Sequence, residues 1–270
     1  MRMPDNILTM NDILPILPAF QDSPLLIAGP CSAENESQMM ETARRLQAVG
    51  VHVFRAGVWK PRTRPGGFEG YGVKALQWLS WIKAETGMLT ATEVGCAEHA
   101  RLAVEAGVDL LWIGARTSAS PFAMQEIAET LRGTDKPVLV KNPVCPDLDL
   151  WIGAMERLYN CGIRRLGAIH RGFKTYGQST YRNPPCWELV EEFHQELPEI
   201  PLICDPSHMG GSRALVAPLS LTALDKGYQG LIIESHCNPA AALTDAQQQI
   251  TPDDLGRLIR KINLPQPIRI

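Results

Sequence analysis

One pattern of hydrophobic and polar positions recurs along the chain: a short apolar run, bounded by Gly, Pro or polar residues, is followed by a longer amphipathic stretch. The short runs have the length and the continuous apolar character of strands buried in a parallel sheet. In the longer stretches, such as 36–50 and 96–107, apolar residues recur every three or four positions, as on one face of a helix. The predicted strands are residues 23–30, 51–58, 88–94, 108–115, 136–143, 163–172, 201–208 and 230–236.

Several of the amphipathic stretches end in a glycine just before the next apolar run, which is typical of a helix C-cap. These glycines are Gly50, Gly87, Gly107, Gly162 and Gly227. The complete pattern gives eight strand–helix units, and eight such units close into a barrel. An open doubly wound sheet usually has about five to seven strands, and no Gly-rich phosphate loop or dinucleotide motif follows the first run.

The sequence therefore predicts the α/β class, as a (β/α)8 TIM barrel with a short N-terminal extension. The expected division is an extension over residues 1–22, the barrel over residues 23–264 and a C-terminal tail over residues 265–270. The extension is expected to cap the bottom of the barrel or to form an interface.

Composition and charge narrow the class of protein. The chain has 270 residues, 45% of them hydrophobic, which is enough for one large buried core. A net charge of −3 gives no electrostatic basis for binding nucleic acid or an anionic membrane. No apolar run reaches the roughly 18 to 20 residues of a spanning helix, and the first 20 residues do not resemble a signal peptide. These features predict a cytoplasmic protein with neither a membrane nor a nucleic acid as partner.

Polar side chains gather where the predicted strands end. Because the active sites of barrels lie at the C-terminal ends of the strands, these side chains are expected to share one face. Six cations at one mouth repel one another unless the ligands carry several phosphate or carboxylate groups, which Arg can bind through paired hydrogen bonds. The cationic candidates are Arg55, Lys60, Arg62, Arg116, Lys141 and Arg171. Glu93 ends the third run on the same face.

A second set of strand-end residues has the composition of a metal site. The set is Cys31, His208, Glu234 and Asp245. A thiolate, an imidazole and two carboxylates suit Mn²⁺, Fe²⁺, Co²⁺ or Zn²⁺ better than Mg²⁺ or Ca²⁺. Each residue alone also has an ordinary structural explanation, such as core packing for Cys31 or a pairing of Glu234 with a nearby Arg. Asp205 in turn can simply hold the turn that follows it. The coincidence of the four residues on one face favours a metal site.

The remaining cysteines and histidines do not belong to this group of candidate metal ligands. Seven cysteines without a CxxC pair, in a chain of this class, are expected to be reduced thiols. The cysteines interpreted as structural, mostly as small core residues, are Cys96, Cys145, Cys161, Cys186, Cys204 and Cys237. The histidines without an expected chemical role are His52, His99 and His194, and His170 and His236 lie near the mouth without an assigned role.

Eight motifs at the strand ends carry a family resemblance: AGPCSAE (28–34), FRAGVWKPRTRP (54–65), GART (114–117), VKNP (140–143), IHRG (169–172), DPSH (205–208), IIESH (232–236) and LTDAQQQI (243–250). In this order, over about residues 24–260, they resemble the 3-deoxy-D-arabino-heptulosonate 7-phosphate (DAHP) synthase family. The likeness is to its short bacterial form, which is related to 3-deoxy-D-manno-octulosonate 8-phosphate (KDO8P) synthase. The resemblance implies a metal-dependent transferase of the shikimate pathway that condenses phosphoenolpyruvate with erythrose 4-phosphate.

The resemblance also implies roles for the candidate residues. The metal ligands are Cys31, His208, Glu234 and Asp245, with Mn²⁺ expected ahead of Fe²⁺, Co²⁺ or Zn²⁺. The phosphoenolpyruvate carboxylate is assigned to Arg55, its phosphate to Arg116, Lys141 and Arg171, and the aldose to the segment from Lys60 to Thr63, with Arg62 and Thr63 near the aldose phosphate. The residues expected to take part in the chemistry are Lys141, Glu93, Cys31 and Lys60.

Three alternatives stay open at the level of the sequence. Arabinose 5-phosphate, the substrate of KDO8P synthase, is the competing aldose, although Lys-Pro-Arg-Thr at 60–63 is the pattern of the heptulosonate enzymes. A sugar-phosphate-binding barrel without catalysis is a different class of function. The chain can also be the synthase part of a fusion with a chorismate mutase domain, or act with such a domain in trans. A homodimer or homotetramer is the expected assembly.

Overall fold

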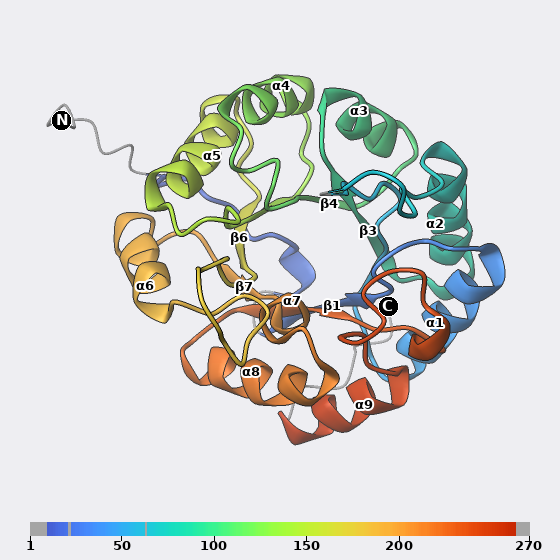
Figure 1. Cartoon of the computed structure of the whole chain (residues 1–270). Helices are drawn as coiled ribbons and strands as arrows, with labels where there is room; N and C mark the ends of the chain where they lie inside the picture. Colours follow the sequence, from blue (N-terminus) through green and yellow to red (C-terminus); the bar gives the residue numbers. More distant parts are fainter. Residues whose placement is uncertain (1–9, 21–22, 63, 263–270) are drawn as a thin grey trace, which may run out of the picture.

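The computed structural model describes residues 10–20, 23–62 and 64–262. The eight predicted apolar runs form eight parallel strands in the order of the sequence, and β8 closes the barrel against β1. In Figure 1 the strands surround the centre and the helices form the outer ring. The (β/α)8 prediction is confirmed. The strands are β1 (Leu25–Gly29), β2 (Val53–Arg55), β3 (Leu89–Val94), β4 (Leu110–Ile113), β5 (Val138–Lys141), β6 (Leu166–His170), β7 (Leu202–Cys204) and β8 (Gly230–Glu234).

The helices follow the amphipathic stretches. They are α1 (Glu36–Ala48), α2 (Val73–Thr86), α3 (Ala97–Glu105), α4 (Pro121–Leu131), α5 (Leu148–Asn160), α6 (Trp187–Glu196), α7 (Pro206–Gly210), α8 (Arg213–Asp225) and α9 (Pro252–Lys261), with short 3-10 turns at Pro18–Phe20 and Pro239–Ala241. The glycine predictions hold at the helix ends: Gly87 caps α2 with φ 71°, a left-handed backbone that favours glycine. The seventh predicted strand, residues 201–208, is too long: β7 ends at Cys204, and Pro206–Gly210 form the short helix α7.

The hydrophobic core has two layers. The larger layer lies between the strands and the ring of helices, and the smaller one fills the inside of the barrel, with Leu110, Trp112 and Leu139 among its members. Ile16 closes the inner layer at the N-terminal end of the strands, where its Cδ1 would lie 2.7 Å from a Cβ added to Gly167. Because the interior is filled with side chains, only the opposite end of the barrel is available for polar groups.

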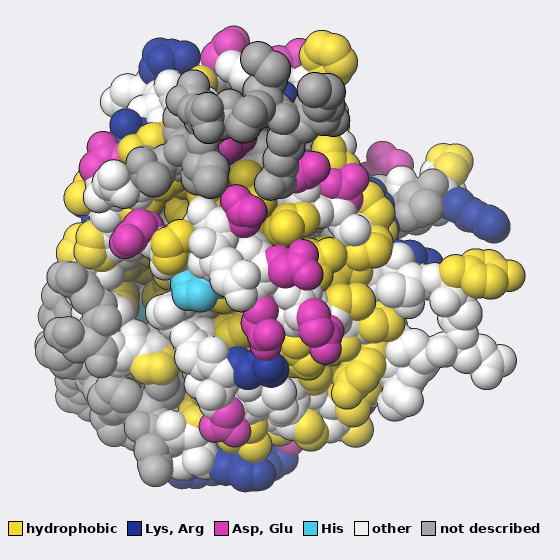
Figure 2. All heavy atoms as spheres, turned by 90° about the vertical axis from the view of Figure 1, so that its left-hand side faces the viewer, with side chains coloured by type: hydrophobic (Ala, Val, Ile, Leu, Met, Phe, Trp, Pro, Cys, Tyr) yellow, Lys and Arg dark blue, Asp and Glu magenta, His cyan; other side chains and the backbone are white. Residues whose placement is uncertain are grey.

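None of the helices within residues 10–262 that the structure describes is long and apolar enough to cross a bilayer. Figure 2 shows the flank of the barrel that lies on the left-hand side of Figure 1, where acidic side chains are more widespread than basic ones.

Candidate active site

The C-terminal ends of the strands open into a cavity of about 350 Å³, within the usual size range of small-molecule sites. Seven of its lining residues are Lys or Arg and two are acidic, so the cavity attracts anions. The basic residues are Lys60, Arg62, Arg116, Lys141, Arg171, Lys174 and Arg182. The structure thus brings five of the six predicted cations to one cavity.

The sixth predicted cation, Arg55, is buried at the end of β2 with 1% of its surface exposed. Its Nη2 lies 3.4 Å from the carbonyl oxygen of Cys31 and 3.5 Å from Oε1 of Glu234. Its Nε and Nη1 have no hydrogen-bond partner among the described residues, although both are buried. A buried guanidinium with unsatisfied N–H groups is costly, and an anion that accepts from these N–H groups removes the cost.

The four predicted metal ligands meet beside Arg55. One ligand atom each from Cys31, Glu234 and Asp245 lies within 4.8 Å of the other two. The Nε2 of His208 lies 3.7 Å from Oε1 of Glu234 and 4.0 Å from Oδ2 of Asp245, and the sulfur of Cys31 lies 3.5 Å from the same Oδ2. Ligand atoms around one divalent ion with bonds of about 2.0 to 2.3 Å are about 3 to 4 Å apart.

The imidazole of His208 is aimed at this cluster by Asp205. Asp205 follows β7 and caps α7, where its Oδ1 accepts from the backbone N–H of His208 at 3.1 Å. Its Oδ2 lies 2.8 Å from Nδ1 of the same imidazole, so Nε2 is the nitrogen that faces Glu234 and Asp245. A carboxylate behind a histidine is the usual way to orient a histidine that binds a metal.

The titration of these groups reflects their burial and their charges. Burial, followed by the charge of Glu234, raises the pKa of Cys31 to about 12. Burial by itself would raise the pKa of both carboxyls. The charges of His208 and Arg55 nevertheless lower the pKa of Glu234, and the charges of His208 and Arg182 lower the pKa of Asp245. Two ionised carboxylates therefore face one another beside a thiol, which favours a cation between them.

Asp245 adds a local strain to the site. Its backbone has a φ of 46°, a left-handed conformation that non-glycine residues adopt only when the surroundings hold it. Arg182 from the loop after β6 holds it, donating to Oδ1 of Asp245 at 2.9 Å and to Oε1 of Gln248 at 2.6 Å. Gln248 in turn donates to Oε2 of Glu234 at 2.6 Å. Arg182 thus fixes two of the candidate ligands at once.

Lys141 is joined to the same network from the other side. Its ammonium, on β5, lies 2.8 Å from Oδ2 of Asp205. Burial opposes the charge of Asp205, but His208 and Lys141 together hold the pKa of this carboxyl well below its usual range. Asn142 accepts from the backbone N–H of Arg171 at 2.8 Å, which ties the ends of β5 and β6 together. Burial lowers the pKa of Arg171 to about 10, which shows how far this cation is removed from water.

Glu93 faces the cavity from β3. Its Oε2 accepts from the indole Nε1 of Trp112 at 3.3 Å, and a Cβ added to Gly114 would lie only 2.1 Å from its Oε1. Lys60 lines the same cavity, with Nζ donating to the carbonyl oxygen and the sulfur of Cys31 at 3.1 and 3.2 Å. Lys60 therefore contacts the metal-ligand cluster, and Glu93 lines the same cavity.

The segment assigned to the aldose lies at the rim. Arg62 donates to the carbonyl oxygen of Phe68 at 2.7 Å, which shapes the loop after β2, and Arg116 is exposed at the cavity wall. Thr63, the last residue of the predicted aldose segment, lies outside the described residues. The rim cations are thus more accessible than Arg55 and Lys141.

Sequence reasoning missed Arg182 and Gln248 altogether and saw in Asp205 only a turn residue. The spacing of Asp205 and His208 in the DPSH motif could have revealed this contact. The third residue after a helix N-cap lies next to the N-cap side chain. No sequence pattern indicates a role for Arg182, because its partner Asp245 is 63 positions away in the chain. His99, expected to have no role, lies near the site, stacked on Trp59 at 4.0 Å.

All seven cysteines are free thiols, as predicted. Of the six cysteines interpreted as structural, Cys161 and Cys204 are buried as expected. Cys145 is exposed, and the half-buried ones are Cys96, Cys186 and Cys237. The interpretation as a core residue is therefore wrong for Cys145, because the loop after β5 carries it to the surface.

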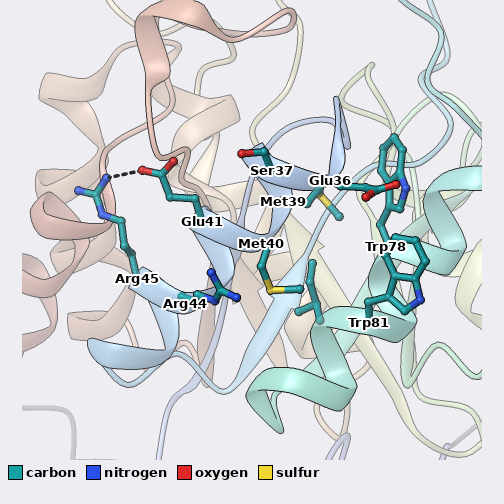
Figure 3. A pocket seen from close by; sticks show the side chains of 10 residues that line it. Glu36, Ser37, Met39, Met40, Glu41, Arg44, Arg45, Trp78 and Trp81 are labelled. Atoms are coloured by element: carbon teal, nitrogen blue, oxygen red, sulfur yellow. Dashed lines mark ion pairs between the residues drawn. The ribbon is translucent and has the colours of Figure 1, made fainter.

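A larger hollow, of about 770 Å³, lies on the outside of the barrel between α1 and α2 (Figure 3). Its floor is apolar, with Met40, Trp78 and Trp81, and the drawn ion pair joins Arg45 to Glu41 at its edge. None of the predicted site residues lines it. The residues predicted to take part in binding and catalysis lie at the mouth of the barrel instead.

A TIM barrel whose mouth combines a ring of cations with a Cys-His-Glu-Asp cluster defines a class of enzymes that act on small polyanions. A family model described as the DAHP synthetase I family matches residues 17–263. The phospho-2-dehydro-3-deoxyheptonate aldolase of Thermotoga maritima is 35% identical over 237 residues, covering 88% of this chain and 68% of that protein. The chain belongs to the DAHP synthetase I family.

Further comparisons agree with this placement. The crystal structure of the Thermotoga maritima enzyme has a TM-score of 0.81 at 32% identity, covering 90% of this chain and 69% of that one. A truncated form of 3-deoxy-D-arabino-heptulosonate 7-phosphate synthase from the same organism has a TM-score of 0.76 at 30% identity, with coverage of 88% and 84%. The 2-dehydro-3-deoxyphosphooctonate aldolase of Geobacter sulfurreducens is 29% identical over 268 residues, covering 89% of this chain and 92% of that protein.

Proposed function

We propose that this chain condenses phosphoenolpyruvate with erythrose 4-phosphate and water, giving 3-deoxy-D-arabino-heptulosonate 7-phosphate and inorganic phosphate, with a divalent metal ion as cofactor. Membership of the DAHP synthetase I family supports the reaction. One observation carries the proposal: the cations and the four candidate metal ligands lie together at the mouth of the barrel. Beside them is Arg55, which is buried and has two N–H groups without a partner among the described residues.

The residues present fit a divalent ion. The Oε1 of Glu234 is buried and accepts no hydrogen bond within the described part of the chain, and it lies 3.7 Å from Nε2 of His208. Cys31, His208, Glu234 and Asp245 would hold the ion, and the mixture of sulfur, nitrogen and oxygen donors favours Mn²⁺, Fe²⁺, Co²⁺ or Zn²⁺. When bound, such an ion supplies Lewis-acid polarisation of the aldehyde carbonyl.

The side chains of the chain itself bind and orient the two anions. Arg55 receives the carboxylate of phosphoenolpyruvate on its unpaired N–H groups, and Arg116, Lys141 and Arg171 receive its phosphate. Arg62 receives the phosphate of the aldose at the rim. Two anions that repel each other in water are thereby held together, so that positioning and charge neutralisation supply most of the rate.

The bonds change in three steps. C3 of phosphoenolpyruvate attacks the aldehyde carbon, which forms the new C–C bond and places positive charge on C2. Lys141 delivers a proton to the alkoxide oxygen of the former aldehyde, and Lys60 helps to neutralise charge beside Cys31. Water, oriented by Glu93, adds to C2 and gives one proton to Glu93. The C2–O bond to phosphate then breaks, the C2 hydroxyl becomes the ketone, and its proton leaves with the inorganic phosphate.

The test is the release of inorganic phosphate from phosphoenolpyruvate with erythrose 4-phosphate or arabinose 5-phosphate, with and without EDTA and added Mn²⁺. We expect turnover with erythrose 4-phosphate that EDTA abolishes and Mn²⁺ restores. Turnover mainly with arabinose 5-phosphate would assign the chain to the octulosonate reaction, and no turnover with either sugar would support a binding barrel without catalysis. Turnover insensitive to EDTA would reject the metal.

A further inference from the structure

Trp112, at the end of β4, is a fully buried side chain that contacts two of the site residues. It belongs to the hydrophobic cluster inside the barrel, so its indole projects into the interior rather than toward the helices. Its Nε1 donates to Oε2 of Glu93 at 3.3 Å. The guanidinium carbon of Arg55 lies 4.7 Å from the centre of its ring. The roles assigned above to Glu93 and Arg55 make no use of this tryptophan.

The contact with Glu93 is built into the sheet. β3 and β4 pair in parallel with Glu93 directly beside Trp112 in the register. An indole N–H only donates, so it holds Oε2 as an acceptor. On the other side, the absence of a Cβ at Gly114 leaves the space that Oε1 needs, since an added Cβ would lie 2.1 Å away. β4 and its last turn therefore determine where the carboxylate points.

The contact with Arg55 supports its guanidinium without using any of its N–H groups. The Nη2 of Arg55 is directed toward Cys31 and Glu234, while Nε and Nη1 have no partner among the described residues. The face of an indole attracts a guanidinium through its π electrons and leaves the N–H groups free at the edge. Trp112 therefore stabilises the cation in an orientation in which its unpaired N–H groups are open to a ligand.

We infer that Trp112 is a positioning residue that sets the directions of Arg55 and Glu93 together, through its ring face and its N–H respectively. The inference rests on the proposed function, in which Arg55 binds the carboxylate of phosphoenolpyruvate and Glu93 orients water. If Trp112 only filled the barrel, any large apolar side chain would serve in its place. The two contacts can be removed separately, because phenylalanine keeps a ring without the N–H and leucine keeps neither.

The experiment compares Trp112→Phe and Trp112→Leu with Trp151→Phe as a matched control. Trp151 is also fully buried and donates one hydrogen bond, to the carbonyl oxygen of Val140 at 3.2 Å, but it belongs to α5 and touches neither Arg55 nor Glu93. Affinity for phosphoenolpyruvate is measured by calorimetry without aldose, turnover by phosphate release, and stability by thermal unfolding.

We expect Trp112→Phe to bind phosphoenolpyruvate within about twofold of the parent and to lose about tenfold in kcat, the equivalent of one hydrogen bond. Trp112→Leu should lose kcat as well and bind phosphoenolpyruvate about tenfold more weakly, because the support under Arg55 is gone. Trp151→Phe should lower the Tm and leave both constants unchanged.

Full kcat in Trp112→Phe, or unchanged phosphoenolpyruvate affinity in Trp112→Leu, would overturn the inference. The same conclusion follows if Trp151→Phe shows the same split between affinity and kcat. A failure of the proposed function is distinguishable, because the parent protein would then release no phosphate with either aldose. The calorimetric comparison would still test the Arg55 contact.

Discussion

The ammonium of Lys60 donates to both the carbonyl oxygen and the thiol sulfur of Cys31, at 3.1 and 3.2 Å. The contact joins the loop after β2 to the end of β1. Burial by itself would lower the pKa of Lys60, but the charges of Cys31, Glu93 and Glu234 raise it above its usual value, so the lysine stays a cation. The residue assigned to the aldose and the only sulfur in the metal-ligand set are therefore in direct contact.

Replacement of Cys31 tests the metal site most directly. We expect Cys31→Ser to lower affinity for Mn²⁺ or Zn²⁺ by about 100-fold or more, because a hydroxyl is a poor substitute for a thiolate and loss of even an indirect partner costs about 10- to 100-fold. Metal retained after dialysis and EDTA-sensitive phosphate release are the measurements. Cys145→Ser, which removes an exposed thiol, is the control and should behave as the parent does. Full activity of Cys31→Ser in EDTA would exclude a metal role for this residue.

Arg182 should control metal affinity without touching the ion. In Arg182→Met, Asp245 loses a 2.9 Å partner and Gln248 loses the contact that holds it against Glu234. Because partners of this kind typically contribute about 10- to 100-fold to metal affinity, a decrease of that size is expected. Competition with a fluorescent chelator measures it. Lys174→Met removes another cation from the same cavity and should leave metal affinity unchanged; equal losses in the two variants would mean that only total charge matters.

The fold and the location of the site could be predicted because both depend on local patterns. A run such as VDLLWIGA is apolar throughout, which identifies a strand buried on both faces. Once eight strands are parallel, residues at their C-terminal ends must share a face, and this brings Cys31, His208 and Glu234 together without any knowledge of distances.

The connections among these residues could not be predicted in the same way. The apolar run containing Trp112 has no alternation, so the sequence does not say that its indole faces inward, toward Arg55 and Glu93. Arg182 reaches Asp245 only because the loop after β6 returns over the mouth, where Asn183 donates to the carbonyl oxygen of His208. Contacts between distant parts of the chain depend on such loop paths, which no local pattern encodes.

The space beside Gly114 predicts a specific effect on catalysis. In Gly114→Ala the new Cβ would lie 2.1 Å from Oε1 of Glu93, so the carboxylate must move. A displacement of about 1 Å at a reacting centre can cost about 100-fold, and we expect kcat to fall by about 10- to 100-fold with the fold retained. Phosphate release and circular dichroism check the two expectations.

Gly153→Ala provides the control for this substitution. It lies inside α5, where an added Cβ meets nothing within 4 Å, so alanine should leave kcat unchanged and stabilise the helix by about 0.5 to 1 kcal/mol. An unchanged kcat in Gly114→Ala would show that the orientation of Glu93 does not limit the rate.

His170 should make the stability of the barrel sensitive to acid. It is fully buried, with Nε2 2.7 Å from the carbonyl oxygen of Pro185 and Nδ1 2.8 Å from the hydroxyl of Tyr228, and burial lowers its pKa to about 3. The carbonyl can only accept, so Nε2 carries the proton and Nδ1 accepts from the tyrosine, and the neutral ring is fully satisfied. The histidine therefore resists protonation in the fold.

The unfolded chain takes up a proton at this histidine below a pH of about 6.5, whereas the folded chain does so only near pH 3. The contribution to stability is therefore complete above pH 6.5 and falls by about 1.4 kcal/mol per unit as the pH drops toward 3. At pH 5 the free energy of unfolding should be about 2 kcal/mol lower than at pH 7 on account of this residue. Urea unfolding at pH 7 and pH 5 measures the difference in free energy of unfolding. In His170→Gln this difference should be about 2 kcal/mol smaller than in the parent protein, whatever the stability of the variant at pH 7. A His170 ring that titrates near pH 6.5 by NMR would contradict the prediction.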